Sequence, residues 1–301
     1  MTADSYRSAL AVVAVALLLV VAGCGEVGDG AAPTTEPTAT TQTTQTTEPT
    51  ATTSTVRTVE GETEPPFSAE RLPPGAETDG SVAVGRLAAA HDEALAGSSF
   101  ALELNFSRTV TAADGSTRRL ATSQRTRADG NGEFLFRFVN PQAGLRQTVW
   151  GNDSTAVSRV VTSETVSYRD ADPEAVRANL SARPFVEQFL SVGDYSVAVA
   201  GEDRVLLTAT EASDAAADRI GESVSSVDDY RGRVVVDSTG RIRSLSVGAD
   251  VSLGEGGSAT LGVSVALSGL GSTDIERPEW VAEALRQTDG RLAAATEQRS
   301  R

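Results

Sequence analysis

The stretch Phe100-Ala101-Leu102-Glu103-Leu104-Asn105-Phe106-Ser107 decides how this chain folds. Large apolar side chains occupy every second position and small or polar residues stand between them, which is the period of a half-buried β-strand. A hairpin turn is expected at Asp114-Gly115, because this pair favours a tight reversal of the chain. Further strand-like runs, each bounded by turn residues, are expected at about 116–128, 132–139, 145–151, 154–161, 164–169, 195–200, 204–210, 230–237, 241–249 and 258–268.

Helical segments accompany these strands. Apolar residues recur at helical spacing from Val82 to Leu95, and Gly97 follows as a C-terminal cap would. Asp172-Pro173-Glu174 places an N-cap, a first-turn proline and a first-turn acid in order. Other helices are expected to begin at Pro184, at Ser213 (running to about Val224) and at Pro278.

The order of these elements predicts the fold class. Tight turns between successive strands force antiparallel pairing. A long meander with one apolar face has to curl over something, and the helices are the available filling. The expected fold is therefore α+β: a single domain at residues 81–290, in which a curled antiparallel sheet of about eleven strands, a half-barrel, is wrapped over helices.

The amino-terminal segment is typical of an exported protein. Arg7 precedes an apolar run from Ala9 to Gly23, which assigns residues 1–23 to a secretory signal peptide. The stretch Val21-Ala22-Gly23-Cys24 resembles a lipobox, the signal of bacterial and archaeal lipoproteins. That resemblance implies cleavage before Cys24 and a lipid on its sulfur. The alternative, a permanent spanning helix, is disfavoured because a run of about 15 residues is shorter than the roughly 20 that a bilayer requires.

Residues 24–80 differ in composition from the rest of the chain. Between Thr34 and Thr58 there are 14 threonines, with prolines among them and few apolar side chains. Such a segment buries too little surface to offset its conformational entropy, so we expect a disordered stalk that tethers the domain to Cys24. The stalk is either O-glycosylated or an unmodified acidic spacer. The tail at 291–301 is expected to be flexible.

Charge and composition exclude several classes of function. The chain carries 41 acidic residues against 26 basic ones, all of them arginine, and its formal net charge is −15. The excess of negative charge repels the phosphate groups of nucleic acids, so no nucleic acid is expected as a partner. Without lysine there is no P-loop, no Ser-Lys dyad and no Schiff-base lysine. The lipobox, threonine stalk and acidic lysine-free domain together resemble an uncharacterised group of haloarchaeal surface lipoproteins.

The order of elements over about 82–290 resembles the half-barrel of periplasmic lipoprotein carriers of the LolA type and of lipid-binding lipoproteins of mycobacteria. The resemblance rests on element order and implies a hydrophobic cavity for acyl chains. The cavity candidates are side chains that share one face of a strand: Phe100, Leu102, Leu104, Phe106, Phe134, Phe136 and Phe138. The alternative for the same side chains is a filled core.

Candidate catalytic groups are few. His91, the only histidine, shares a helix face with Leu87 and Leu95, and we expect it to pack at the edge of the core. The acidic pairs Glu202-Asp203 and Asp228-Asp229 fall in turn-like segments, where carboxylates are ordinarily solvated. The sequence has no HExxH, CxxC or EF-hand pattern. We therefore expect no enzyme, no cofactor and no metal site.

A group of arginines is the first of two further surface features. Arg119, Arg125 and Arg127 share one face of a strand. They either form a basic stripe for lipid head groups or anionic glycans, or pair with acids on neighbouring strands.

Glycosylation sequons are the second surface feature. They begin at Asn105, Asn152 and Asn179. If Phe106 points into the core, period-two geometry sends Asn105 outward, where a glycan has to lie. Asn152 falls in a turn and Asn179 near a helix end, so both are expected to be reachable.

The sequence therefore predicts a non-enzymatic lipoprotein on the outer face of the cell membrane, anchored through lipidated Cys24. Its domain is expected to bind or carry a hydrophobic or amphipathic, lipid-like ligand. The alternative is an envelope or adhesion module that makes protein or glycan contacts and holds no ligand.

Replacing Cys24 by Ser is expected to release the protein from the membrane, because a hydroxyl cannot form the thioether. The measurement is fractionation of cells after washing with carbonate and high salt. A Cys24→Ser variant retained in the membrane to the same degree as the wild type would instead favour a spanning helix.

Overall fold

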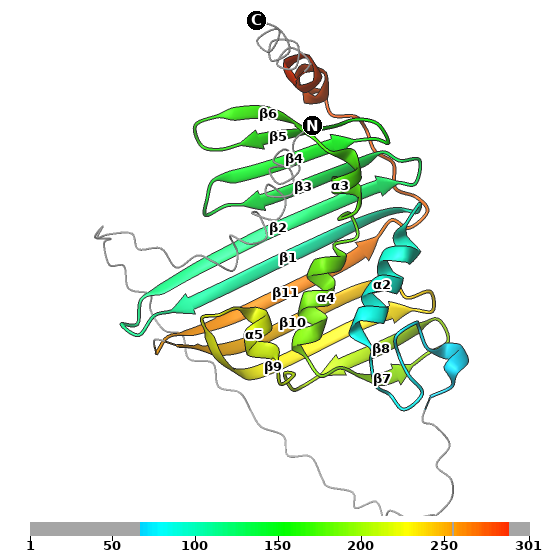
Figure 1. Ribbon diagram of the computed structural model, residues 1–301, viewed down its shortest axis with the longest axis vertical. Coiled ribbons are helices and arrows are strands. Elements are labelled where there is room, and N and C mark those ends of the chain that lie inside the picture. The colour runs from blue at the N-terminus through cyan, green and yellow to red at the C-terminus, as the bar shows by residue number, and fades with distance from the viewer. Residues whose placement is uncertain (1–66, 255, 289–301) are drawn as a thin grey trace, which may run out of the picture.

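The computed structural model describes residues 67–254 and 256–288 of the chain. They form an antiparallel sheet of eleven strands in the order β6-β5-β4-β3-β2-β1-β11-β10-β9-β8-β7, with helices against one face (Figure 1). The sheet is open, with β6 and β7 at its two edges. The expected α+β half-barrel is confirmed. Cys24, the signal peptide, residues 24–66 of the stalk and the tail lie outside the described residues.

The strands follow the predicted series closely, and β11 begins and ends at the predicted residues 258 and 268. Their bounds are β1 (Ser99–Thr111), β2 (Thr117–Asp129), β3 (Phe134–Asn140), β4 (Leu145–Gly151), β5 (Ala156–Val161), β6 (Val166–Ala171), β7 (Ser196–Ala200), β8 (Arg204–Ala209), β9 (Val224–Asp237), β10 (Ile242–Leu253) and β11 (Ser258–Ser268).

Strand β1 lies in the middle of the sheet. It pairs with β2 from Ser99 to Thr111 and with β11 from Ala101 to Thr111. Its alternating apolar residues are buried on the face that the helices cover, called here the inner face, whereas Asn105 is exposed on the outer face. Because residues paired across neighbouring strands point to the same face, β2 and β11 also have one buried inner face and one outer face.

The helices are α2 (Val84–Leu95), α3 (Pro173–Arg177), α4 (Arg183–Val192) and α5 (Ala216–Ile220). Helix α2 ends where expected, and Gly97 follows in the left-handed region at φ +67°. Asp172 caps α3 as predicted, since its side chain accepts hydrogen bonds from the backbone N–H groups of Glu174 and Ala175.

The helix expected from Ser213 to about Val224 is wrong in extent. Only Ala216–Ile220 is helical, and Val224 already begins β9. The Ser213 hydroxyl donates to the carbonyl of Ser191 at the end of α4, at 2.9 Å, so it does not cap α5. Gly221 ends the helix at φ 150°, a conformation that favours glycine. The first part of β9 is mostly exposed, so no apolar alternation signals it.

His91 joins α2 to two distant segments. Its side chain is fully buried, deeper than the core edge expected from the sequence. Nδ1 accepts a hydrogen bond from the backbone N–H of Ile242 at 3.1 Å, and Nε2 donates to the carbonyl of Ser181 at 3.2 Å. This arrangement requires a neutral imidazole, and burial lowers the pKa of His91 to about 4.

A pair of buried tyrosines fixes the end of α4 over the sheet. The hydroxyls of Tyr195 and Tyr230 are 2.9 Å apart, and Tyr230 also donates to the carbonyl of Phe189 at 3.3 Å. Burial raises the pKa of Tyr230 to about 12. A Cβ at Gly232 would lie 2.1 Å from the Tyr195 hydroxyl oxygen, so only glycine allows this ring to lie against β9.

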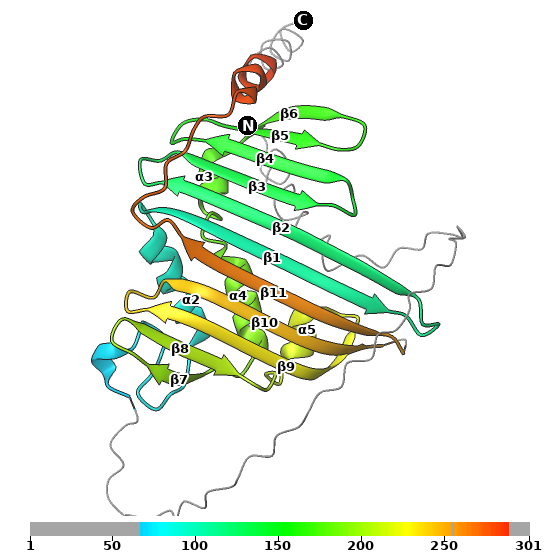
Figure 2. The same cartoon turned by 180° about the vertical axis from the view of Figure 1, so that it is seen from behind.

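The carboxyl-terminal segment packs on the outer face. A helix at 280–288 buries Val281 and Ala284 against Trp150, Val157 and Tyr168 of β4, β5 and β6. Figure 2 shows this segment running from β11 to the β6 end of the sheet. A second, smaller apolar cluster therefore packs the carboxyl-terminal helix against the outer face of these strands.

The packed unit begins before Ser81. Ala76 is buried, and Gly80 accepts a hydrogen bond from the backbone N–H of Val197 at 2.8 Å. Residues 67–80, assigned to the stalk from composition, therefore belong to the folded unit. Among the helices in the described ranges, none combines the length and apolar character needed to cross a bilayer.

Acid is expected to destabilise the fold through His91. Its pKa in the folded state lies below the unfolded value near 6.5, so the folded state binds fewer protons between pH 6.5 and about 4. The stabilisation is complete above pH 6.5, and about 3 kcal/mol is lost as the pH falls through this window. The measurement is the free energy of unfolding in urea across that range.

The matched variant is His91→Gln, which keeps a polar side chain that does not titrate. We expect it to be less stable than the wild type at pH 7.5 and to lose less stability on acidification. Parallel pH profiles for the two proteins would show that another group causes the loss.

Candidate functional site

Aromatic side chains connect α4 to the centre of the inner face. The Phe106 ring on β1 lies 6.1 Å from that of Phe189, centre to centre, and the Phe185 and Phe189 rings are 4.5 Å apart. Helix α4 starts with Pro184 in its first turn and turns four side chains, Phe185, Val186, Leu190 and Val192, into the core. This cluster of tilted aromatic rings therefore sets how α4 lies above β1.

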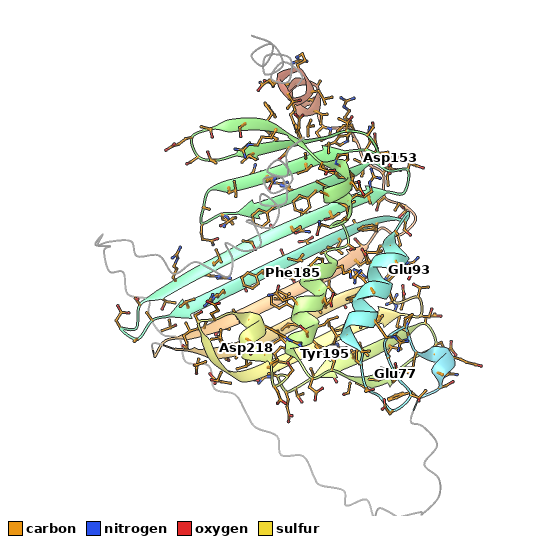
Figure 3. The ribbon with its side chains drawn as sticks, viewed as in Figure 1. Glu77, Glu93, Asp153, Phe185, Tyr195 and Asp218 are labelled. Atoms are coloured by element: carbon orange, nitrogen blue, oxygen red, sulfur yellow. The ribbon has the colours of Figure 1, made fainter. Side chains whose placement is uncertain are left out.

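A cavity remains beside this aromatic cluster, between the sheet, α4 and α5. Phe185 and Asp218 mark these two helices in Figure 3. The space has a volume of about 60 Å³, and we call it the α4–α5 cavity. Its lining combines apolar and uncharged polar groups with two arginines: Leu104, Phe106, Arg108, Thr122, Ser123, Gln124, Phe138, Phe185, Gln188, Phe189, Val192, Arg219, Ile220 and Leu261.

The charges of the cavity are all positive. Arg108 and Arg219 line it, and none of the described residues in its wall carries a carboxylate. Nε of Arg108 is buried and has no hydrogen-bond partner, whereas Arg219 donates from Nη1 to the carbonyl of Ser191. An apolar space with a guanidinium at one side suits a molecule that has both an apolar and an anionic part.

The structure divides the seven predicted cavity residues. Leu104, Phe106 and Phe138 line the α4–α5 cavity. Phe100 lines a second, wider cleft. The others are buried in the main core and line neither space: Leu102, Phe134 and Phe136.

The second cleft lies between the end of α2, α3 and the turns that follow β2 and β4. Its volume is about 870 Å³, and its floor includes Leu95, Phe100, Ala128 and Leu180. The rim is charged, with Asp92, Glu93, Glu133, Asp153, Glu174, Arg177 and Arg183. No cluster of three acidic or histidine side chains suited to a metal ion occurs in the described part of the chain.

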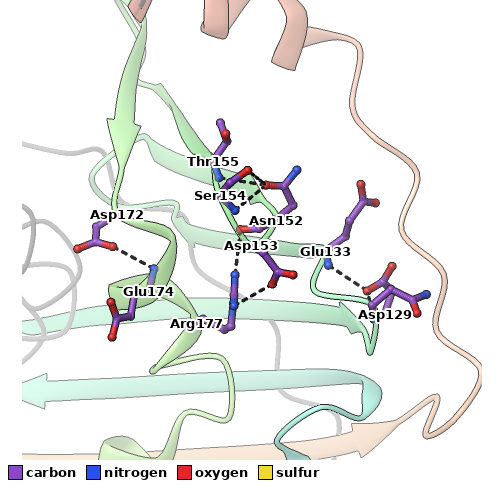
Figure 4. A network of polar contacts seen from close by, with 10 residues as sticks. Asp129, Glu133, Asn152, Asp153, Ser154, Thr155, Asp172, Glu174 and Arg177 are labelled. Atoms are coloured by element: carbon purple, nitrogen blue, oxygen red, sulfur yellow. Dashed lines mark hydrogen bonds and ion pairs between the residues drawn. The ribbon is translucent and has the colours of Figure 1, made fainter.

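Contacts within the chain fix the rim of this cleft (Figure 4). Arg177 pairs with Asp153 at 2.9 Å and donates to the carbonyl of Asn152 at 3.0 Å. Asp129 accepts from the backbone N–H of Glu133 at 3.0 Å. These groups are occupied in holding the turns, so the cleft offers a ligand fewer free groups than its size suggests.

The predicted arginine stripe lies on the outer face, away from both spaces. Arg125 pairs with Glu103 on β1 at 3.3 Å, and Arg127 donates to the carbonyl of Asp274. Arg119 lines a shallow groove on the same face. Pairing with an acid on a neighbouring strand, one of the two expected alternatives, therefore accounts for Arg125, whereas Arg127 bonds a backbone carbonyl instead.

The acidic pairs do not converge on a cavity. Glu202 and Asp203 are exposed in the turn between β7 and β8. Asp228 accepts hydrogen bonds from the hydroxyls of Ser226 and Ser252, which hold its pKa below the ordinary value, and Asp229 pairs with Arg231 at 2.9 Å. An ionised, exposed Asp228 is a poor general acid.

The three sequon asparagines differ in their contacts. Asn105 is exposed on the outer face, as predicted from the alternation of β1. Asn152 lies in a turn, where its side-chain oxygen accepts from the backbone N–H groups of Ser154 and Thr155. The amide nitrogen of Asn179, the atom that a glycan would use, donates to the carbonyl of Ala175 at 2.8 Å.

Sequence reasoning missed most of the cavity wall. The α4 and α5 side chains show no signal of their own, because their position over the sheet depends on tertiary packing. Arg108 did have a signal: it continues the even-numbered series of Phe100, Leu102, Leu104 and Phe106, and alternation alone sends it inward.

Comparison with known proteins gives a family. The model of a family of unknown function (DUF7537) matches residues 9–284, so the chain belongs to that family. No match was found among curated proteins.

Solved structures show a distant likeness. The crystal structure of LolA superfamily protein NE2245 from Nitrosomonas europaea is 12% identical, with 65% of this chain and 96% of that one covered, at a TM-score of 0.22. A DUF1329 family protein from Desulfovibrio piger is 14% identical, with 66% and 95% covered, at a TM-score of 0.23.

Phe136 and Phe138 allow the division between core and cavity to be tested. Phe136→Ala is expected to destabilise the domain by about 3–5 kcal/mol, as in a filled core. Phe138→Ala enlarges an existing space and is expected to cost less than about 3 kcal/mol. The measurement is denaturant unfolding of both variants at matched salt. Equal losses of the larger size would show that Phe138 is also surrounded by filled core.

Proposed function

We propose that this DUF7537 protein is a non-enzymatic lipoprotein, anchored to the outer face of the membrane through Cys24, whose half-barrel binds a lipid-like ligand. The observation that carries the proposal is the α4–α5 cavity. It lies where two helices meet the inner face, and three of its wall residues, Leu104, Phe106 and Phe138, were predicted cavity residues.

The size of the cavity determines what enters it. A space of about 60 Å³ takes a short piece of hydrocarbon, and a whole acyl chain requires one helix to move. Each buried methylene contributes about 0.8 kcal/mol, so a chain of moderate length supplies enough free energy for a local displacement.

Helix α5 is the element that moves at least cost. It buries only Ala216, whereas α4 buries four side chains and is further held by Tyr230. Two polar contacts fasten α5 to α4, from Arg219 to the carbonyl of Ser191 and from Gln188 to the carbonyl of Arg219 at 3.3 Å. In our proposal α5 opens the cavity and α4 stays in place.

A binding function without catalysis fits the titratable groups of the described residues. The neutral imidazole of His91 has both nitrogens bonded to the backbone and lines neither the α4–α5 cavity nor the second cleft. The alternative function, an adhesion module without ligand, is supported by the wide charged cleft at α2 and α3, whose volume of about 870 Å³ suits contact with a polar partner.

Filling the cavity tests the proposal. Thr122 lies on the inner face of β2 opposite Phe106 and lines the cavity, whereas the adjacent Ala121 points to the outer face. We expect Thr122→Trp to weaken binding of the neutral dye Nile red by roughly tenfold or more, because overpacking costs about 1–3 kcal/mol. Ala121→Trp is the matched control, expected to bind like the wild type.

Native mass spectrometry of protein purified from its own host provides the second measurement, with a co-purifying lipid expected. Absence of dye binding by the wild type, together with absence of lipid, would contradict ligand binding and favour the adhesion module. Equal dye binding by Thr122→Trp and the wild type would place the ligand outside the α4–α5 cavity.

A further inference from the structure

We propose that Arg108 binds the anionic head of an amphiphile whose apolar chain lies in the α4–α5 cavity. This inference rests on the proposed function and specifies its ligand class: single-chain amphiphiles with a carboxylate or phosphate head. Neutral lipids of the same chain length bind more weakly.

Arg108 stands on an apolar surface. It continues the inward-facing series of β1, and its partners in the two neighbouring strands are Leu120 and Leu261. Leu120 packs on the main core and Leu261 is buried within it. Nε of Arg108 is shielded from water here, and the residues directly opposite Arg108 on both neighbouring strands are apolar.

The guanidinium also lacks partners within the described residues. Nε of Arg108 is buried with no hydrogen-bond partner. No ion pair found between the described side chains includes Arg108. A buried donor without an acceptor is costly, and an anionic oxygen is the acceptor that a guanidinium binds best.

The charge around the cavity selects the sign of the ligand. The protein as a whole carries a formal charge of −15, yet the described wall of the cavity has two arginines and no acid. Arg219, on α5, brings a second positive charge to the same space. An anionic head therefore meets an attractive site within an otherwise acidic protein.

The wall also gives the ligand a direction. Along β1 the lining changes from Leu104 and Phe106 to Arg108, so apolar and cationic groups follow one another on a single strand. The chain of the amphiphile lies along the first two residues, and its head lies at the third.

The test measures displacement of Nile red by dodecanoate, dodecyl phosphate and dodecanol, which share a chain and differ in head group. The wild type is expected to prefer both anions over dodecanol. Arg108→Gln is expected to weaken binding of the anions by roughly 10- to 100-fold, the size of a hydrogen bond to a charged group, and to affect dodecanol and Nile red far less, because neither carries an anionic group. Arg119→Gln, on the outer face, is the matched control and is expected to behave like the wild type.

Thermal unfolding of Arg108→Gln separates recognition from structure. We expect no loss of stability without ligand, because the substitution removes a charge that has no partner. Unchanged preference for anions in Arg108→Gln overturns this inference alone, as does loss of dodecanol binding together with the anions. If the wild type binds neither Nile red nor any one of the three amphiphiles, the proposed function and this inference are overturned together.

Discussion

The pairing of β1 on both sides is the constraint on which the rest of the structure depends. It is the sixth strand in a sheet of eleven and is bonded to β2 and β11 over nearly its whole length. A shift of one residue in either register would move Phe100, Leu102, Leu104 and Phe106 from the inner face to the outer face, with a large loss of buried apolar area. The alternation of this strand therefore decides which face of the sheet the helices cover.

A few hydrogen-bonded contacts hold the helices against the inner face, and the cavity lies away from these contacts. His91 joins α2 to β10 through the backbone of Ile242, and the pair Tyr195 and Tyr230 joins the end of α4 to β9. Both points lie on β10 and β9, whereas the strands that bound the cavity are β1, β2, β3 and β11. Helix α5, which buries little, closes the space, so the fold combines firm anchoring with a weakly held cover.

Much of the fold was predictable because local patterns and tertiary packing agree. Alternation placed the strands, and Asp172 with Pro173 placed a helix that the structure caps in that way. The failures occur where distant contacts decide: Ser213 bonds α4 instead of capping α5, and residues 67–80 pack against the domain although their composition resembles a linker. Only three of seven predicted residues line the α4–α5 cavity, since the sequence does not show where α4 lies.

The position of Arg108 explains how a protein of acidic composition is able to bind the anionic ligand proposed above. Exposed carboxylates in an acidic protein oppose the approach of an anion, and salt screens this effect, with a Debye length of about 3 Å at 1 M. A contact at Arg108, a half-buried residue whose Nε is shielded from solvent, is screened less than one between fully exposed groups. An acidic surface is thus compatible with binding an anionic amphiphile, provided that the cationic group lies on the inner face. The inward continuation of the β1 alternation to Arg108 places it there.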